Sequence, residues 1–307
     1  MPENILVGHA LACPPVAEPR HPAFARFAWG VVAYNLAVVL WGAYVRATGS
    51  GAGCGNHWPL CNGVVTPVSA NTHTMIEFTH RAMTGLDTPL VALLLIWAFR
   101  AFPRHHPVRL AATLSGVFLV TEALLGALLV KLQHVAKNAD AYTLSTHLVN
   151  TLTLLACLAL TAWWAMGNPA PRLRGKAAWM AAISLGAVML LSITGAISAL
   201  GDTLFPAPSL AAGLAQDFNP TSNILLRLRG LHPLFAAAVG AWLTLYAVGR
   251  LRVAKSNALW VVTMVWIQLF AGLLNFLLQA PVGMQIVHLL IADLLWISLV
   301  LLCASGS

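Results

Sequence analysis

Apolar positions along the 307-residue chain form long unbroken stretches instead of alternating with polar ones. A helix that crosses a bilayer needs roughly 20 mostly apolar residues. The pattern therefore predicts an all-α polytopic membrane protein with eight transmembrane helices, preceded by a Pro-rich cytoplasmic tail over residues 1–27. The eight stretches lie at about residues 28–46, 79–99, 109–130, 142–166, 177–200, 230–249, 257–279 and 283–303.

The composition excludes several classes of protein. Hydrophobic residues make up 59% of the chain and charged residues only 8%, with a mean hydropathy of +0.79. A soluble domain has about 25% charged residues, so a soluble globular enzyme is excluded, and so is a disordered chain. Five cysteines in a chain of this length do not indicate a secreted disulfide scaffold. The formal charge of +8 is explained by Lys and Arg in the loops of a membrane protein, so no nucleic-acid partner is expected.

The Lys and Arg residues predict the orientation of the spans. Eleven of the 17 fall in the tail and the short loops that lie on the same side as the N-terminus. Cytoplasmic loops carry an excess of Lys and Arg, so both termini are predicted to be cytoplasmic. The two long loops, at about 47–78 and 201–229, then lie outside. The predicted location is the cytoplasmic (inner) membrane of a bacterium or archaeon, with lipid as a partner.

The eight spans divide into two similar sets of four. Motifs near the end of the first span and within the second, third and fourth recur in order in the fifth to eighth. Their offsets drift slowly, as loop insertions would produce: 153 residues for Gly42 and Gly195, 152 for His80 and His232, 146 for Gly126 and Gly272, and 141 for His147 and His288. Four spans restore the starting orientation, so the repeat is parallel. We expect two pseudo-symmetric four-helix bundles, over residues 28–170 and 171–307.

Four of the eleven histidines lie within spans, near the outer ends of the even-numbered ones. They are His80, His147, His232 and His288. Ionisable groups in a span are costly and are functional candidates by default. Haem iron accepts two axial histidines from facing helices of a four-helix bundle, which favours one haem-sized site in each half. Zinc, non-haem iron or copper, and a plain hydrogen bond between helices are the alternatives.

Basic side chains accompany these histidines at the outer rim. Arg81 directly follows His80, and Arg227 and Arg229 precede His232. Arg pairs bidentately with carboxylates, so these residues are candidates to bind the propionates of a haem. The alternative is that they are ordinary interface residues whose charged ends reach the lipid headgroups.

One carboxylate distinguishes the two halves. Glu77 lies three residues before His80 and shares its helical face, whereas the residue three positions before His232 is Arg229. The carboxylate could carry protons or position an oxidised intermediate in the first half. The second half then has the character of an electron-transfer site. The alternatives are that Glu77 pairs with Arg81 or acts as a charge at a helix N-terminus.

Three further acids lie in spans, and two cysteines lie in the first outer loop. A proton path or a polar contact between helices accounts for Asp87, Glu122 and Asp293. Cys54 and Cys61 lie on the oxidising side with six residues between them, so we expect a disulfide. A metal site that combines both thiolates with His57 is the alternative. No role is assigned to His57 or to His73.

These motifs together resemble those of the haem A synthase family, from about residue 29 to 303. The glycine-rich stretch that leads to the cysteine pair and the E-x-x-H-R motif are the specific parts. The resemblance is carried by "YVRATGSGAGC…WPLCNG", "IEFTHR" with Glu77 and His80, "STHL" with His147, "RGLHP" with His232 and "QIVHLLIADLLW" with His288.

The resemblance implies an enzyme that oxidises the C8 methyl group of haem O to a formyl group, giving haem A for respiratory terminal oxidases. It implies a haem b between His232 and His288 as redox cofactor. It implies haem O as substrate between His80 and His147, with Glu77 as a carboxylate needed for activity. Expected partners are haem O, haem A, a haem O synthase and an electron acceptor or donor. A homo-oligomer is left open.

Two other functions compete with this one. A di-haem b-type electron carrier would need the four histidines but no carboxylate beside one of them. A haem transporter would use the histidines as transfer stations and would open on both membrane faces. All four histidines lie towards one face, which disfavours transport.

Overall fold

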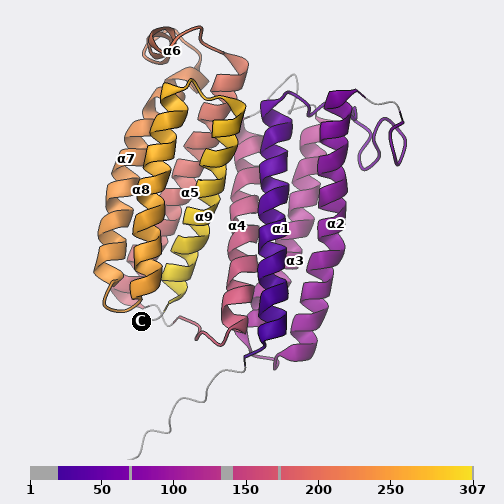
Figure 1. Cartoon of the computed structure of the whole chain (residues 1–307), viewed down its shortest axis with the longest axis vertical. Coiled ribbons are helices and arrows are strands. Elements are labelled where there is room, and N and C mark those ends of the chain that lie inside the picture. Colours follow the sequence, from indigo (N-terminus) through magenta and orange to yellow (C-terminus); the bar gives the residue numbers. More distant parts are fainter. Residues whose placement is uncertain (1–19, 69–70, 133–140, 172–173, 306–307) are drawn as a thin grey trace, which may run out of the picture.

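The computed structural model describes residues 20–68, 71–132, 141–171 and 174–305. Most of the predicted tail, residues 1–19, therefore lies outside the described residues. The described chain folds into helices that stand side by side (Figure 1). The helices are α1 (Pro22–Ala47), α2 (Thr72–Ala101), α3 (Pro107–Lys131), α4 (Ala141–Ala165), α5 (Gly175–Leu204), α6 (Leu210–Asp217), α7 (Ile224–Arg250), α8 (Lys255–Leu277) and α9 (Val282–Ala304).

All eight predicted spans are confirmed as helices long and apolar enough to cross a membrane. Three of them, α1, α2 and α7, begin six or seven residues before the predicted stretches, and polar caps account for α2 and α7. The Asn71 side chain accepts a hydrogen bond from the Thr74 amide at 2.9 Å, and the Asn223 side chain accepts one from the Leu225 amide at 3.0 Å. These caps satisfy N–H groups that a helix start leaves unpaired, so polar residues extend α2 and α7 outward.

Helix α6 is an element that the hydrophobic pattern does not predict. It lies in the second outer loop, across the outer end of the second group of helices (Figure 1). Ser209 caps it by accepting a hydrogen bond from the Ala212 amide at 3.2 Å. The helix is only eight residues long, too short to form a span or to show a clear apolar period.

The long helices pack in two rings of four. In the first ring α1 contacts α2 and α4, and α3 contacts the same two helices. In the second ring α5 contacts α7 and α9, and α8 contacts the same two. Two helices therefore face each other diagonally across each ring: α2 and α4 in the first, α7 and α9 in the second. This is the predicted pair of four-helix bundles, in which facing helices can hold a group between them.

The contacts between the bundles repeat the same symmetry. Helix α4 packs against its counterpart α9, and the contact of α1 with α9 is matched by the contact of α5 with α4. Trp296 of α9 donates a 2.7 Å hydrogen bond from Nε1 to the carbonyl oxygen of Leu152 in α4. A pseudo-twofold axis therefore runs between α4 and α9.

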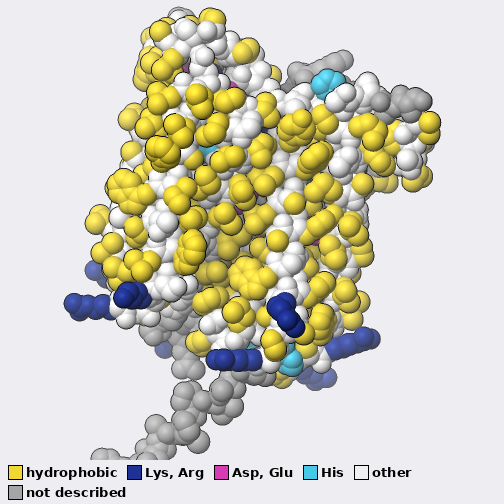
Figure 2. All heavy atoms as spheres, in the orientation of Figure 1, with side chains coloured by type: hydrophobic (Ala, Val, Ile, Leu, Met, Phe, Trp, Pro, Cys, Tyr) yellow, Lys and Arg dark blue, Asp and Glu magenta, His cyan; other side chains and the backbone are white. Residues whose placement is uncertain are grey.

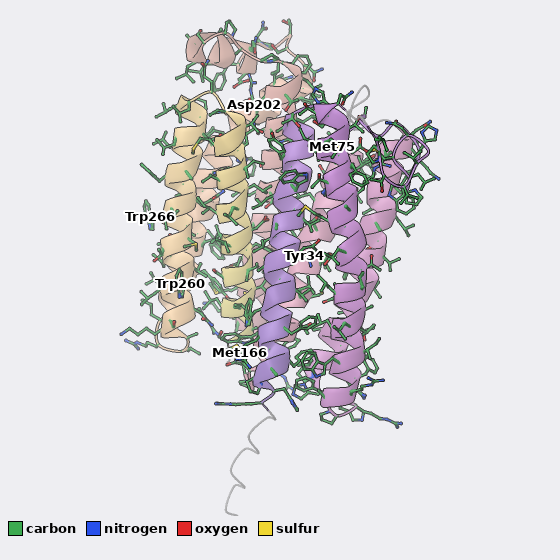
Figure 3. All side chains as sticks on the ribbon, turned by 45° about the vertical axis from the view of Figure 1, so that its right-hand side comes forward. Tyr34, Met75, Met166, Asp202, Trp260 and Trp266 are labelled. Carbon is green, nitrogen blue, oxygen red and sulfur yellow. A yellow bond between two sulfur atoms is a disulfide. The ribbon has the colours of Figure 1, made fainter. Side chains whose placement is uncertain are left out.

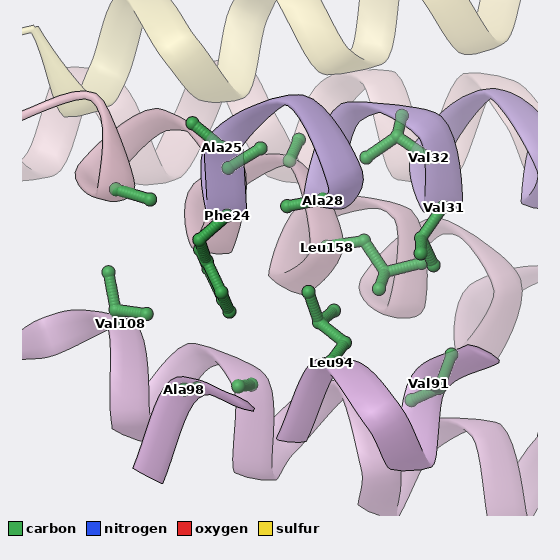
Figure 4. Close-up of a cluster of buried hydrophobic side chains, with 14 of the residues drawn as sticks. Phe24, Ala25, Ala28, Val31, Val32, Val91, Leu94, Ala98, Val108 and Leu158 are labelled. Atoms are coloured by element: carbon green, nitrogen blue, oxygen red, sulfur yellow. The ribbon is translucent and has the colours of Figure 1, made fainter. Parts of the chain in front are cut away.

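Charge and apolar packing differ between the two ends of the first bundle. Lys and Arg side chains gather at the end of the molecule where α1 begins (Figure 2). Near this end a buried cluster joins α1, α2, α3 and α4 (Figure 4). Its largest fully buried members include Phe24, Leu94 and Leu158. The inner part of the bundle is thus closed by close-packed hydrocarbon, and the polar chemistry is left to the outer part.

The hydrogen bond between the bundles gives a stability prediction. Substituting Trp296 by Phe keeps most of the ring volume but removes the Nε1 donor to Leu152. Losing one buried hydrogen bond should lower the free energy of unfolding by about 1 kcal/mol. A thermal denaturation midpoint measured in detergent checks this. Trp266→Phe is the matched control, because Trp266 is 61% exposed and projects away from the helices on α8 (Figure 3). An equal effect of both substitutions would contradict the prediction.

Candidate functional site

The four predicted histidines occupy the diagonal helices of the two bundles. His80 lies on α2 and His147 on the facing helix α4, while His232 lies on α7 and His288 on the facing helix α9. All four side chains are partly buried. His80 lies within electrostatic range of His147, and His232 within range of His288. The structure therefore brings together the two pairs that the sequence predicted.

A glycine lies against each histidine, on a helix between the two that carry the pair. A Cβ atom built on Gly42 would lie 2.9 Å from Cε1 of His80, and one built on Gly195 would lie 3.2 Å from Cε1 of His232. These two glycines are counterparts in the repeat. A real Cβ essentially never approaches an atom as closely as 2.9 Å, and 3.2 Å is tighter than most real Cβ contacts, so a side chain at either position would press on the imidazole.

The second histidine of each pair also lies near a glycine, with more room in one case. A Cβ on Gly272 would lie 3.0 Å from Cε1 of His288, and one on Gly126 would lie 4.0 Å from Cε1 of His147. Sequence reasoning used these glycines to align the repeat but missed their contact with the histidines. The signal was present, because each glycine recurs at the same offset as the motif around it.

The ring nitrogens show what these sites lack. Nδ1 of His80, His147 and His288 has no hydrogen-bond partner although the atom is buried. Buried polar atoms in proteins are normally paired, and an unpaired one marks a place for a missing partner. A flat aromatic macrocycle with a central iron between the facing helices would bind one nitrogen of each ring, for which Nε2 is the candidate, and would set the rotation of the ring that decides what Nδ1 contacts. Among the described residues no three His, Cys, Asp or Glu side chains gather into one cluster, so the histidines are available as pairs.

Glu77 is buried and fully engaged. One carboxylate oxygen accepts hydrogen bonds from Arg81, at 3.1 Å from Nε and 2.5 Å from Nη2. The other accepts the backbone N–H of Cys54 at 2.8 Å. The side chain is 4% exposed. The alternative interpretation of Glu77 as the partner of Arg81 thus describes its contacts, and the carboxylate also attaches the first outer loop to α2.

The Arg81 guanidinium also donates hydrogen bonds to the first outer loop. Nη1 donates to the carbonyl oxygens of His57 and Leu60 at 3.0 and 2.5 Å, and Nη2 lies 3.4 Å from that of Gly55. With the two bonds to Glu77, all five N–H groups of the guanidinium have protein partners. These contacts make Arg81 the anchor of the loop, and the binding of a propionate by Arg81 stays a prediction.

Arg229 has an equivalent place in the second bundle. Its guanidinium lies 2.7 Å from Asp217, at the end of α6, and 3.0 Å from Asp202 in the last turn of α5. Asp202 lies near the outer end of the molecule in Figure 3. Arg229 therefore attaches α6 to the bundle. Arg227, by contrast, is exposed.

The first outer loop contains the predicted cysteine pair. Cys54 and Cys61 form a disulfide in the structure, with Cα atoms 4.4 Å apart, which leaves no thiolate pair for a metal site with His57. His57 is exposed, and His73 Nδ1 lies 3.0 Å from the hydroxyl of Ser50. Both histidines therefore belong to the loop and its join with α2.

The remaining intramembrane acids have different surroundings. Asp87 is 2% exposed and accepts a 2.9 Å hydrogen bond from Asn35 of α1. Glu122 accepts hydrogen bonds from Asn150 and Thr151 of α4. Asp293 is 1% exposed, and its Oδ2 has no hydrogen-bond partner. Sequence reasoning identified the three acids but not the amide and hydroxyl partners, which come from other helices.

Arg46 joins the two bundles at the outer side. Its guanidinium donates to the carbonyl oxygen of Ala199 at 3.0 Å and to the hydroxyl of Thr203 at 3.2 Å, both on α5. It also donates to Oε1 of Gln285 on α9 at 3.1 Å. Sequence reasoning missed this contact, because it links residues more than 150 positions apart.

The glycine contacts generate a prediction about haem binding. Substituting Gly42 by Ala places a methyl group against His80 and must displace the imidazole. Groups that orient a metal ligand typically change affinity by about 10- to 100-fold, so haem bound in the first bundle should weaken by about tenfold. Haem per protein, measured by extraction and absorption, checks this. Gly30→Ala on the same helix is the control, because a Cβ there meets nothing within 4 Å.

The second bundle supplies an independent copy of this test. Gly195→Ala should weaken haem binding beside His232, and Gly186→Ala on the same helix should not, because a Cβ there has open space. Retention of full haem by both Gly42→Ala and Gly195→Ala would contradict the assignment of the histidine pairs.

Comparison with known proteins agrees with this architecture. The chain is 48% identical over 298 residues to a Thermus thermophilus protein named protoheme IX farnesyltransferase, and the match covers 93% of the chain and 49% of that protein. The chain thus spans about half the length of the Thermus relatives that it matches.

Shorter matches reach proteins named heme A synthase. One from Geobacillus kaustophilus is 43% identical over 101 residues, covering 33% of this chain and 32% of the relative. One from Bacillus mycoides is 46% identical over 92 residues, covering 30% of each. The model of the cytochrome oxidase assembly protein family matches residues 25–300. The resemblance to the haem A synthases is therefore confirmed, and the chain belongs to the cytochrome oxidase assembly protein family.

Proposed function

We propose that the chain oxidises the C8 methyl group of haem O to a formyl group and so produces haem A. The observation that carries the proposal is the pair of histidines facing each other across each bundle, each ring seated against a glycine. We propose that these two sites accommodate a substrate haem and a resident haem. We assign haem O to His80 and His147, and haem b to His232 and His288.

The assignment of the two sites rests on what differs between the bundles. Glu77 lies one helical turn from His80, and its counterpart in the repeat is Arg229. Conversion of a methyl group to an aldehyde breaks two C–H bonds, forms a C=O bond and oxidises the carbon by four electrons. An oxidant from outside the chain must take up these electrons, and protons must leave an apolar interior. A carboxylate beside the reacting haem can receive them, whereas electron transfer needs no such group. Haem b, when bound, supplies one-electron transfer.

Side chains of the first bundle would hold the substrate, exclude water from it and position Glu77. His80 and His147 would hold the haem between α2 and α4, and the apolar cluster around Leu94 closes the inner side against water. Glu77 is pinned by Arg81 and by the Cys54 amide, so the disulfide loop and the carboxylate are positioned together. A preorganised group of this kind needs no rearrangement at the moment of reaction.

The length of the Thermus relatives suggests which enzyme acts beside this chain. Their name describes transfer of a farnesyl group to protohaem, and the matched segment is half of each protein. We propose that the farnesyl step belongs to the other half and that this chain acts next to a farnesyltransferase that supplies haem O. We place both in the cytoplasmic membrane, with the end rich in Lys and Arg on the cytoplasmic side.

A di-haem electron carrier is the competing function. Expression of the chain in cells that make haem O but not haem A separates the two. The proposed enzyme should yield haem A, or haem hydroxylated at the C8 methyl group, in extracted pigments analysed by chromatography and mass. Folded, haem-loaded protein without either product would exclude the proposal and favour the carrier.

Glu77 provides the sharper variant. Glu77→Ala should leave the absorption spectrum of the second-bundle haem intact and reduce oxidation by about 100-fold or more, as expected for a positioned acid–base group. Product formation per haem checks this.

Because Glu77 also attaches the loop, a control must loosen the loop alone. Thr74→Val does so, since the Thr74 hydroxyl donates to the Gly53 carbonyl oxygen at 2.8 Å without contacting the carboxylate. Comparable losses in Glu77→Ala and Thr74→Val would reduce Glu77 to a structural anchor. Loss of the second-bundle spectrum would contradict the division between the bundles.

A further inference from the structure

Glu122 lies behind one of the four histidines. It occupies α3, one turn from Gly126, and its Oε1 lies 3.6 Å from Nδ1 of His147. This distance is longer than a hydrogen bond, and Nδ1 has no other hydrogen-bond partner. The carboxyl group and the ring nitrogen that faces it thus form an incomplete pair.

The carboxyl group itself is held firmly. The Thr151 hydroxyl donates to Oε1 and the Asn150 amide donates to Oε2, each at 2.5 Å. Thr151 and Asn150 are 6% and 8% exposed. Asn150 is oriented in turn by the Thr121 hydroxyl, which donates to its Oδ1 at 2.6 Å, and by the Phe118 carbonyl oxygen at 2.9 Å. Two helices therefore cooperate to fix one carboxyl group beside His147.

The second bundle replaces this network residue by residue. At the offset of 146 residues that relates Gly126 to Gly272, the counterpart of Glu122 is Gln268. The Gln268 amide lies 3.2 Å from Nε2 of His288, the counterpart of His147. A neutral amide therefore occupies the sequence position of the acid, and it faces the other ring nitrogen, because Nδ1 of His288 has no hydrogen-bond partner.

The polar residues that hold Glu122 are replaced by apolar residues in the second bundle. At the offset of 141 residues that relates His147 to His288, Asn150 and Thr151 become Ile291 and Ala292. Thr121 becomes Ile267 at the offset of 146. A buried carboxyl group without hydrogen-bond donors is costly, so the acid and its donors are present together or absent together.

We propose that Glu122 is a positioning residue for His147: it accepts the Nδ1–H group, leaves Nε2 to the iron, and makes this imidazole a stronger electron donor than His288. The proposal rests on the proposed function, because it requires a haem between His80 and His147. Groups that bond to the second nitrogen of a metal-ligating histidine fix its tautomer and raise its basicity.

The other histidines show that this arrangement is specific. Nδ1 of His232 lies 2.9 Å from the hydroxyl of Thr194, a neutral partner, and Nδ1 of His80 has no partner. His147 is the ligand that faces an acid. A more basic imidazole stabilises ferric over ferrous iron, so the first-bundle haem should have a lower midpoint potential than the same ligands would give without Glu122.

Redox titration of the purified full chain, followed by absorption, tests this. The component lost in His147→Ala is assigned to the first bundle. Glu122→Gln should raise its midpoint potential, changing the ferrous-to-ferric ratio at a fixed potential by about tenfold, and should leave the other component unmoved. Gln268→Glu, the reciprocal variant, should lower the potential of the second component. Glu122→Asp, which keeps the charge, should shift the first component less than Glu122→Gln.

Thr151→Val separates orientation from charge, because it removes one donor but keeps the carboxyl group. It should shift the first component less than Glu122→Gln. A bound first-bundle haem whose potential does not move in Glu122→Gln would overturn this inference and leave the proposed function standing. Loss of product without a shift in potential would also overturn it and would make Glu122 a proton carrier. Failure of the unsubstituted protein to bind added haem O in the first bundle would overturn both.

Discussion

The structure depends on the rule that a polar group inside a bilayer needs a partner, either in the protein or in a group that the protein binds. Four imidazoles, one on each of the four diagonal helices, face inward in two pairs, and a glycine leaves room beside each ring. The helical frame needs only apolar faces to form. The histidines and glycines give each bundle a site in which a flat, largely apolar group can bind between two facing helices.

The repeat is symmetric in its frame and asymmetric in its chemistry. In the first bundle Asn35 donates to Asp87, and both are buried. At the offsets of 153 and 152 residues the second bundle has Val188 and Val239, which pack in its apolar core. With Glu77 and its surroundings, this gives the first bundle the side chains that can accept or hold protons. The counterparts of the three first-bundle acids are thus Arg229, Val239 and Gln268, none of them an acid, which suits a second-bundle group that only exchanges electrons.

The sequence alone predicted the spans, the repeat and the histidine pairs, because hydrophobic length and residue identity determine them. It did not predict what the polar side chains contact. Arg81 was assigned to a ligand because nothing local shows that loop carbonyl oxygens take its N–H groups. The partners of Glu122 come from α4, and those of Arg46 from α5 and α9. Such contacts depend on how distant helices are rotated, and a hydrophobic pattern fixes that rotation only coarsely.

Arg46 has a consequence for how two fused copies diverge. In a homodimer with twofold symmetry every contact occurs twice, because each subunit presents the same patch. The counterpart of Arg46 is Ala199, and it is the backbone of that residue that receives the guanidinium. The hydrogen bond therefore runs only from the first bundle to the second. A symmetric dimer of identical subunits would form the same bond twice. In one chain the two sides of the interface can carry different residues, and a copy of the second half in place of the first would lack the Arg46 guanidinium.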